Sequence, residues 1–419
     1  MKRQSLPIIN LAGLTLVFSL SFASYMLDSI SNLVQLVPIL LFATIVVLNL
    51  FASDSAAESI ADLFDGDGLL FVILIAVLIV AISLASGSDI SIEASFVIGA
   101  VLLLSRLYMA LVPIDQVLEA FFWSGVLCIA LFVLAGFSSL LHSMETLERL
   151  SPFSFHPNLL GFFAAGYFCA MVWKFLQSGW RMRLLSGFTA TVCLCIIFFA
   201  SSRGSLIGVA LGCCTISTVA AIRAWREGRF RFGGRGLAII GILLVIIGTS
   251  YQSDTFQELF QFTDQALAIT DSHRGVGSGF TGRADKWKET LGSLTDGSWL
   301  VGKGIRTSDT LGEDQIDNSY VVILYELGPV CLLLILFRFL DVARRLLRAY
   351  MNSIDQRSSS LYLACLLVIV SFLANNFVAR YLFSVGNSFS LICLFLFVTP
   401  SSKISATFDA RERRIHATA

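Results

Sequence analysis

Long apolar runs separated by polar connections recur along the whole chain. A membrane-spanning helix needs roughly 17–25 mostly apolar residues, and twelve segments meet or approach this length. They cover about residues 6–27, 33–52, 69–86, 94–112, 117–140, 158–177, 183–200, 204–222, 236–250, 319–340, 361–379 and 381–399. The pattern therefore predicts an all-α integral membrane protein with about twelve transmembrane helices.

The composition agrees with a membrane protein and excludes other classes. Of the 419 residues, 56% are hydrophobic and 14% are charged, whereas about a quarter of a soluble domain is charged. The 29 basic and 29 acidic residues balance, so no excess of basic charge indicates nucleic acid as a partner. All nine cysteines lie in apolar runs and are typical of packing residues rather than of disulfides or metal ligands. We expect neither a metal nor another cofactor.

The basic residues predict the orientation in the membrane. The connections on the side of the N-terminus hold 19 lysines and arginines, the opposite connections hold nine, and Arg106 falls within a span. Because cytoplasmic connections are enriched in these residues, we expect both termini in the cytoplasm. The predicted units are nine helices in 1–250, an extracytoplasmic loop in 251–318, three helices in 319–400 and a cytoplasmic tail in 401–419.

One segment of the long loop has the pattern of a short amphipathic helix. Within residues 282–294, apolar residues recur at spacings of three, four and three, at Ala284, Trp287, Leu291 and Leu294. Such a stripe indicates a helix that lies on the bundle or on the membrane surface. Loops of this length in compact proteins usually carry function.

Two arginines are expected in the first turns of helices on the extracytoplasmic side. Ser202 is a candidate N-cap that would place Arg203 in a first turn, and Thr281 would do the same for Arg283. Helix N-termini carry partial positive charge, so a cation there indicates an anionic ligand. The alternatives are an interfacial arginine that reaches the headgroups at 203, and an ion pair with Asp285 or another loop acid at 283.

Two further residues precede predicted spans on the same side. Asp317 is either the cap of the tenth span, since aspartate is a favoured cap, or a carboxylate available for chemistry. His156 stands before Pro157 at the start of the sixth span, and a proline there is usual at a helix start. A lone histidine in this place is more often structural than a ligand.

Taken in order, these stretches resemble the O-antigen ligase/polymerase superfamily, which includes Wzy-type O-antigen and exopolysaccharide polymerases. The likeness is clearest over about residues 156–335. The matching elements are His156-Pro157-Asn158, Ser202-Arg203-Gly204, Gly282-Arg283 followed by Trp287, Leu300-Val301-Gly302-Lys303-Gly304, Asp317-Asn318-Ser319-Tyr320 and Glu326-Leu327-Gly328.

The resemblance implies a metal-independent glycosyltransferase in the bacterial inner membrane, acting on an oligosaccharide linked to undecaprenyl diphosphate. Arg203 and Arg283 would bind the diphosphate, and Asp317 would be the general base. The implied substrate-binding residues are Lys303, Arg306, His156 and Asn318. The implied partners are the lipid-linked oligosaccharide, membrane lipid and a chain-length regulator protein.

Three functions are compatible with these features. In the ligases a histidine usually stands at the position of Asp317, so the aspartate favours a polymerase of repeat units. The first alternative is a ligase that transfers the glycan to lipid A core or to a protein. The second is a flippase or other transporter, which would bury charged residues near the bilayer midplane. Because Arg106 is the sole candidate of that kind in the predicted spans, we favour an enzyme.

Overall fold

The computed structural model describes residues 6–24, 32–52, 67–146, 148–152, 156–228, 254–267, 270, 283–294, 297–311, 316–384 and 386–400. Within these ranges the regular elements are all helices. Eight of them are long and apolar enough to cross a membrane, and further apolar helices are shorter. The prediction of an all-α membrane protein is therefore confirmed.

Eleven of the twelve predicted spans correspond to helices in the described ranges. They are α1 (Leu6–Ala23), α2 (Asn32–Ala52), α4 (Asp67–Ser86), α5 (Asp89–Leu111), α6 (Ile114–Ala135), α8 (Pro157–Gln177), α9 (Trp180–Phe199), α10 (Arg203–Arg226), α15 (Ser319–Asn352), α16 (Gln356–Asn375) and α17 (Ser388–Val398). The remaining prediction, 236–250, lies outside the described residues. The shorter peripheral elements are α7 (Phe137–Thr146), α12 (Asp254–Leu267), α13 (Arg283–Gly292), α14 (Ser298–Val301) and the 3-10 helix η2 (Thr307–Leu311).

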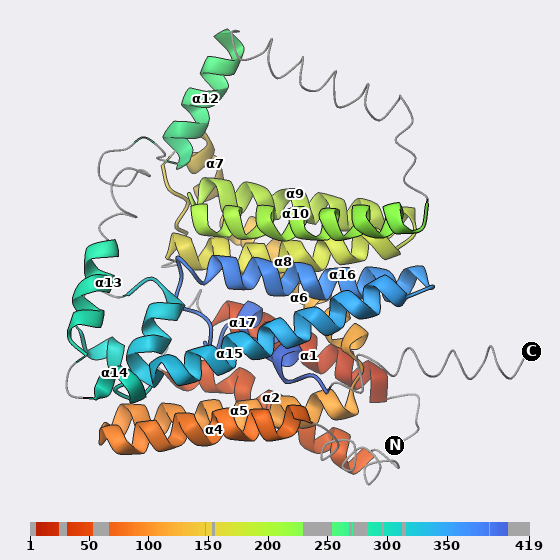
Figure 1. The fold of residues 1–419 in the computed structure, drawn as a ribbon. Helices are drawn as coiled ribbons and strands as arrows, with labels where there is room; N and C mark the ends of the chain where they lie inside the picture. The colour runs from red at the N-terminus through yellow and green to blue at the C-terminus, as the bar shows by residue number, and fades with distance from the viewer. Residues whose placement is uncertain are drawn as a thin grey trace, which may run out of the picture.

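The long helices lie side by side and form a bundle with two distinct ends (Figure 1). We call the end that carries α13, α14 and the start of α15 the loop end, and the end where α10 and α15 finish the basic end. At the basic end Arg223 of α10 donates hydrogen bonds to the Tyr350 carbonyl and the Ser359 hydroxyl, at 3.0 and 2.8 Å. These bonds join the last turns of α10 and α15 to the first turn of α16.

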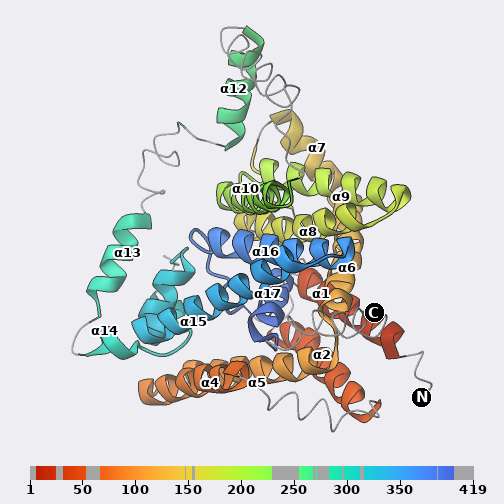
Figure 2. The same ribbon diagram turned by 45° about the vertical axis from the view of Figure 1, so that its right-hand side comes forward.

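The chain changes ends between α10 and α12. Helix α10 finishes at the basic end, whereas α12 lies at the loop end (Figures 1 and 2). There Phe262 stacks on Phe198 in the last turn of α9, with ring centroids 5.9 Å apart. Helix α12 was not predicted from the sequence.

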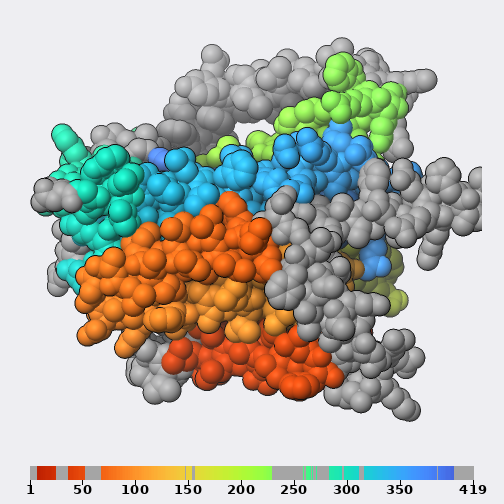
Figure 3. All heavy atoms as spheres, turned by 60° about the horizontal axis from the view of Figure 1, so that its bottom comes forward, coloured from red at the N-terminus to blue at the C-terminus, as the bar shows by residue number. Residues whose placement is uncertain are grey.

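One side of the bundle is formed by α4 and α5 next to α15, with α13 and α14 at one end of it (Figure 3). Apolar side chains of α4 are exposed, including Leu70, Leu74 and Val77. Hydrocarbon tails solvate such side chains well, and the backbone polar groups of a helix are satisfied internally. This surface is suited to contact with lipid.

Three predicted boundaries were wrong. The fifth span ends at Ala135, where Gly136 separates it from α7. The tenth continues to Asn352, so Arg338 is a buried helical residue and does not belong to a connection. In the described part of the last predicted span, only 388–398 is helical. Eleven helical residues extend about 16 Å, roughly half of the hydrocarbon thickness.

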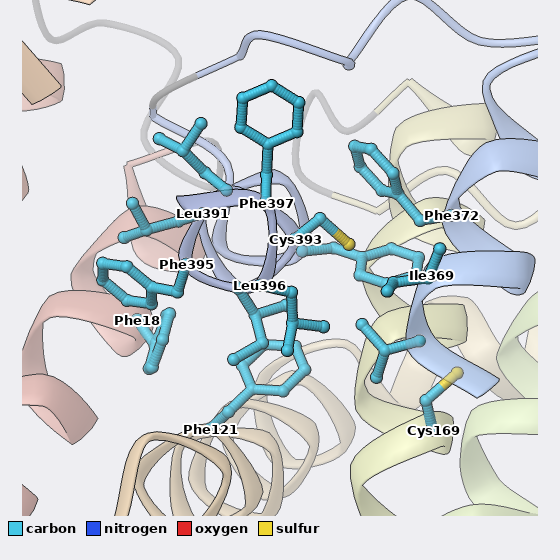
Figure 4. Close-up of a cluster of buried hydrophobic side chains, with 14 of the residues drawn as sticks. Phe18, Phe121, Cys169, Ile369, Phe372, Leu391, Cys393, Phe395, Leu396 and Phe397 are labelled. Atoms are coloured by element: carbon cyan, nitrogen blue, oxygen red, sulfur yellow. The ribbon is translucent and has the colours of Figure 1, made fainter. Parts of the chain in front are cut away.

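This short helix, α17, is buried along its whole length and forms the centre of the core. Phe18, Phe121 and Phe372 surround it from three other helices (Figure 4). Its last carbonyls lack partners within the helix, and two buried arginines bind them. Arg106 donates to the Val398 carbonyl at 2.9 Å, and Arg338 donates to those of Phe397 and Thr399 at 2.9 and 2.8 Å. Arg106 therefore has a structural partner, which removes the observation that most favoured a transporter.

We predict that the loop end faces the periplasm. An alkaline phosphatase fusion after Gly292, in α13, should be active because this enzyme needs an oxidising compartment. A fusion in the turn between α15 and α16, at Ser353, should be inactive as the matched control. A cytoplasm-only reporter that is active at Gly292 would contradict this orientation.

Candidate functional site

The first candidate arginine begins helix α10 as predicted. Arg203 is the first residue of the helix, and Ser202 occupies the N-cap position. The Ser202 hydroxyl does not cap a helix amide, however, and donates instead to the Ser205 hydroxyl at 2.9 Å. Arg203 is partly exposed, and its charge lies at the positive end of the helix dipole.

Small residues allow the start of α10 to pack closely on the end of α16. A Cβ atom on Gly204 would lie 1.9 Å from Cγ2 of Val378, and one on Gly208 would lie 2.7 Å from the Ser371 carbonyl oxygen. The Asn375 amide also donates to the Ser205 hydroxyl at 3.0 Å. This close contact places Arg203 next to the segment that follows α16.

The second candidate arginine is bonded to the candidate base. Arg283 is the first residue of α13, and its guanidinium donates to Oδ2 of Asp317 at 2.7 Å and to the Val378 carbonyl at 3.3 Å. The alternative of an ion pair with a loop acid is therefore correct in kind, but the partner is Asp317. Val378 therefore accepts from Arg283 and also lies beside Gly204, the residue after Arg203. The predicted cap of α13, Thr281, lies outside the described residues.

Helix α13 docks on the bundle largely through the predicted face, since Trp287, Leu291 and Leu294 are half-buried. Trp287 packs edge-on against Phe377, with ring centroids 5.8 Å apart, and Thr290 is buried. Ala284, which was assigned to the apolar face, is exposed. The prediction therefore failed only at Ala284, in the first turn of the helix.

Asn318, and not Asp317, caps helix α15. The Asn318 side-chain oxygen accepts hydrogen bonds from the backbone N–H groups of Tyr320 and Val321, at 2.9 and 3.1 Å. The interpretation of Asp317 as the cap was therefore wrong. Its side chain is 32% exposed and bonds to Arg283 through one oxygen, which leaves lone pairs of the carboxylate for another partner.

His156 lies within the electrostatic range of the same groups. It occupies the N-cap position of α8, before Pro157. Partial burial lowers the pKa of its imidazole, the charges of Arg149 and Arg283 lower it further, and Asp317 opposes them. Together these influences favour the neutral form of the imidazole.

Arg149 is a site residue that the sequence analysis did not single out. Its guanidinium donates to the Ala200 carbonyl at 2.9 Å and to Oδ1 of Asn158 at 2.6 Å. These bonds hold the turn before Arg203 against the start of α8. The only signal in the sequence was an arginine on the side of the membrane that is poor in basic residues.

The lowered pKa of His156 predicts a pH effect on stability. Because the unfolded chain takes up this proton at a higher pH than the folded chain, wild-type stability should fall as the pH drops below about 6.5. His156→Gln should therefore lose less apparent Tm than the wild type between about pH 7 and pH 5. His142→Gln, at an exposed histidine, is the control. Equal losses for His156→Gln and the wild type would contradict the prediction.

Lys303 and Arg306 form other contacts in this structure. Lys303 donates to the Ser293 carbonyl at 3.1 Å and lies 5.1 Å from the Tyr325 ring centroid. Arg306 is 59% exposed and pairs with Asp309 at 3.1 Å. Within the described ranges neither is bonded to Arg283 or Asp317, and their role in substrate binding stays a prediction.

A cavity of about 680 Å³ lies at the basic end, far from these residues. Four of the charged groups in its lining form two ion pairs, Lys174 with Glu119 at 2.5 Å and Arg357 with Asp115 at 3.2 Å. Paired charges have little capacity left for a charged substrate. We therefore place the candidate site at the loop end.

Comparison with known families finds a match for the middle of the chain. Residues 188–336 match the family model described as O-antigen ligase, which confirms the resemblance to the O-antigen ligase/polymerase superfamily. The matched region runs from within α9 to the middle of α15 and includes Arg203, Arg283 and Asp317. His156 and the segment after α16 lie outside it. No curated protein matches the chain. The match supports glycosyl transfer of the O-antigen ligase or polymerase type.

Proposed function

We propose that this protein polymerises undecaprenyl-diphosphate-linked oligosaccharide repeat units at the periplasmic face of the bacterial inner membrane. The observation that carries the proposal is the bond between Arg283 and Asp317, at 2.7 Å, beside the N-terminus of α10. This bond brings together a guanidinium, which suits a diphosphate, and a carboxylate, which can accept the proton of a hydroxyl. The aspartate at 317 favours a polymerase over a ligase.

In the proposed reaction a hydroxyl oxygen of the acceptor sugar attacks the anomeric carbon of the donor sugar. The new glycosidic C–O bond forms while the bond from the anomeric carbon to the diphosphate oxygen breaks. The leaving oxygen keeps the electron pair, and undecaprenyl diphosphate departs. The hydroxyl proton passes to the carboxylate of Asp317, which acts as the general base.

The two arginines stabilise the leaving group. Fixed donors aimed at developing negative charge are among the largest contributions to catalysis. Arg203 adds its charge to the positive end of the α10 dipole. Arg283 is shared, because a bound diphosphate competes with Asp317 for its guanidinium. Donor binding thereby frees the carboxylate to accept the proton.

The glycans of a deletion strain test the proposed function. Loss of a polymerase should leave single repeat units on the final acceptor, whereas loss of a ligase should leave long chains on the lipid carrier. Loss of a flippase should trap single units on the cytoplasmic side. Long chains that accumulate on the carrier would replace the proposal by the ligase alternative.

A further inference from the structure

The segment that follows α16 wraps around the residue next to the Asp317–Asn318 pair. The Ser319 N–H lies 3.0 and 2.9 Å from the Asn376 and Ala379 carbonyl oxygens, and its hydroxyl donates to the Ala379 carbonyl at 2.9 Å. The Leu382 N–H in turn donates to the Ser319 hydroxyl at 3.2 Å. The backbone just before Arg380 is thus held beside Ser319, two residues after the candidate base. Arg380 also lies two residues beyond Val378, whose carbonyl accepts from Arg283 and whose side chain lies beside Gly204.

Only some of the hydrogen-bond donors of the Arg380 guanidinium have a partner in this position. Its Nη2 group pairs with Oδ1 of Asp309, whose other oxygen accepts from Arg306. One carboxylate therefore faces two guanidinium groups, and the three residues carry a net positive charge. The Nη1 group of Arg380 is buried and has no hydrogen-bond partner within the described part of the chain.

We propose that Arg380 is a third guanidinium of the anion-binding site and that its Nη1 group donates to a diphosphate oxygen of the lipid donor. The inference rests on the proposed function. Buried polar groups in native structures nearly always have a partner, so an orphaned donor at a substrate site indicates a ligand. A planar guanidinium can keep the Asp309 bond on one nitrogen and bind the diphosphate with the other.

A purely structural role makes a different prediction. Asp309 is positioned without Arg380, because the adjacent Ser308 donates to the Glu326 carboxylate through its backbone N–H, at 3.3 Å, and through its hydroxyl. If Arg380 only joined two loops, removal of Asp309 would be as damaging as removal of Arg380. On the proposal, Asp309→Asn frees the guanidinium and leaves diphosphate binding at least as tight as in the wild type.

The test measures binding of undecaprenyl diphosphate to the purified full-length protein by native mass spectrometry. Arg380→Lys keeps a cation that reaches Asp309 but loses the second donor, and it should weaken binding about tenfold or more. Arg344→Lys, the same change at an exposed arginine of α15 far from the loop end, is the matched control and should leave binding unchanged.

The outcomes separate the inference from the proposed function. If the wild type fails to bind undecaprenyl diphosphate, both fail. If the wild type binds and Arg380→Lys binds equally well, the inference is overturned while the proposed function stands. A loss for Asp309→Asn as large as that for Arg380→Lys, or equal losses for Arg344→Lys and Arg380→Lys, would likewise overturn it. Asp309→Asn keeps the test decisive even if substitutions of Arg380 impair folding.

Discussion

Asp317→Asn should reduce the glycan to single repeat units while the amount of protein in the membrane stays at the wild-type level. A sugar hydroxyl is a poor nucleophile at neutral pH, and a positioned base accelerates such a reaction by roughly 10²–10⁴-fold. Asparagine cannot accept the proton. It can still accept the hydrogen bond from Arg283, which approaches one side-chain oxygen at 2.7 Å.

The substitution also leaves the fold in place, because Asn318 supplies the cap of α15. The matched control is Asp285→Asn, the same chemical change at an exposed residue one half-turn beyond Arg283. It should give a normal ladder of chain lengths. A normal ladder from well-expressed Asp317→Asn would remove Asp317 from the mechanism and make His156 the next candidate base.

Arg283→Ala should abolish polymer. It removes the guanidinium that would donate hydrogen bonds to the diphosphate, and it leaves Asp317 without its ion-pair partner. Arg283→Lys should also be strongly impaired, although it keeps the charge. The guanidinium donates to both Asp317 and Val378 in a fixed planar geometry, and an ammonium group cannot reproduce this fork. Arg203→Ala and Arg203→Lys should follow the same order. The measurement is the chain-length distribution on a gel, normalised to the protein in the membrane.

The control for the arginine series is Arg344→Ala. Arg344 lies near the basic end, is 60% exposed and makes a long ion pair with Asp341, at 3.8 Å. Exposed pairs of this kind contribute little to stability, so its polymer should be normal. Wild-type polymer from stably inserted Arg283→Ala and Arg203→Ala would exclude a diphosphate site at these arginines.

Local signals in the sequence predicted where two residues of the candidate site lie. Arg203 and Arg283 were predicted in first turns because a serine or threonine preceded each at capping distance, and both begin helices. Asp317 was considered as the cap of this helix and Asn318 was not, although the two side chains cap about equally well. The structure assigns that role to Asn318, whose side-chain oxygen accepts from the backbone N–H groups of Tyr320 and Val321.

Other parts of the site depend on contacts between distant segments. From the sequence, Arg380 was predicted to be the boundary between two spans. The residues after it, 381–399, form one long apolar run, but the helix in this run begins only at Ser388. Its contact with Asp309 joins residues 71 positions apart, and the pattern of either segment alone does not predict it. Likewise, the sequence shows Arg106 as a charged residue within a span, which is typical of a transporter. Its partner, the carbonyl of Val398 at the end of α17, is far away in the sequence.

The central claim is that the protein elongates lipid-linked glycans without another enzyme. Its most direct test is to supply the purified protein, in liposomes, with undecaprenyl-diphosphate-linked repeat units as the only substrate. We predict lipid-linked products of two or more repeat units in the wild type and none in Asp317→Asn. Absence of longer products until lipid A core is added, followed by transfer of the glycan to that core, would contradict the claim and identify a ligase.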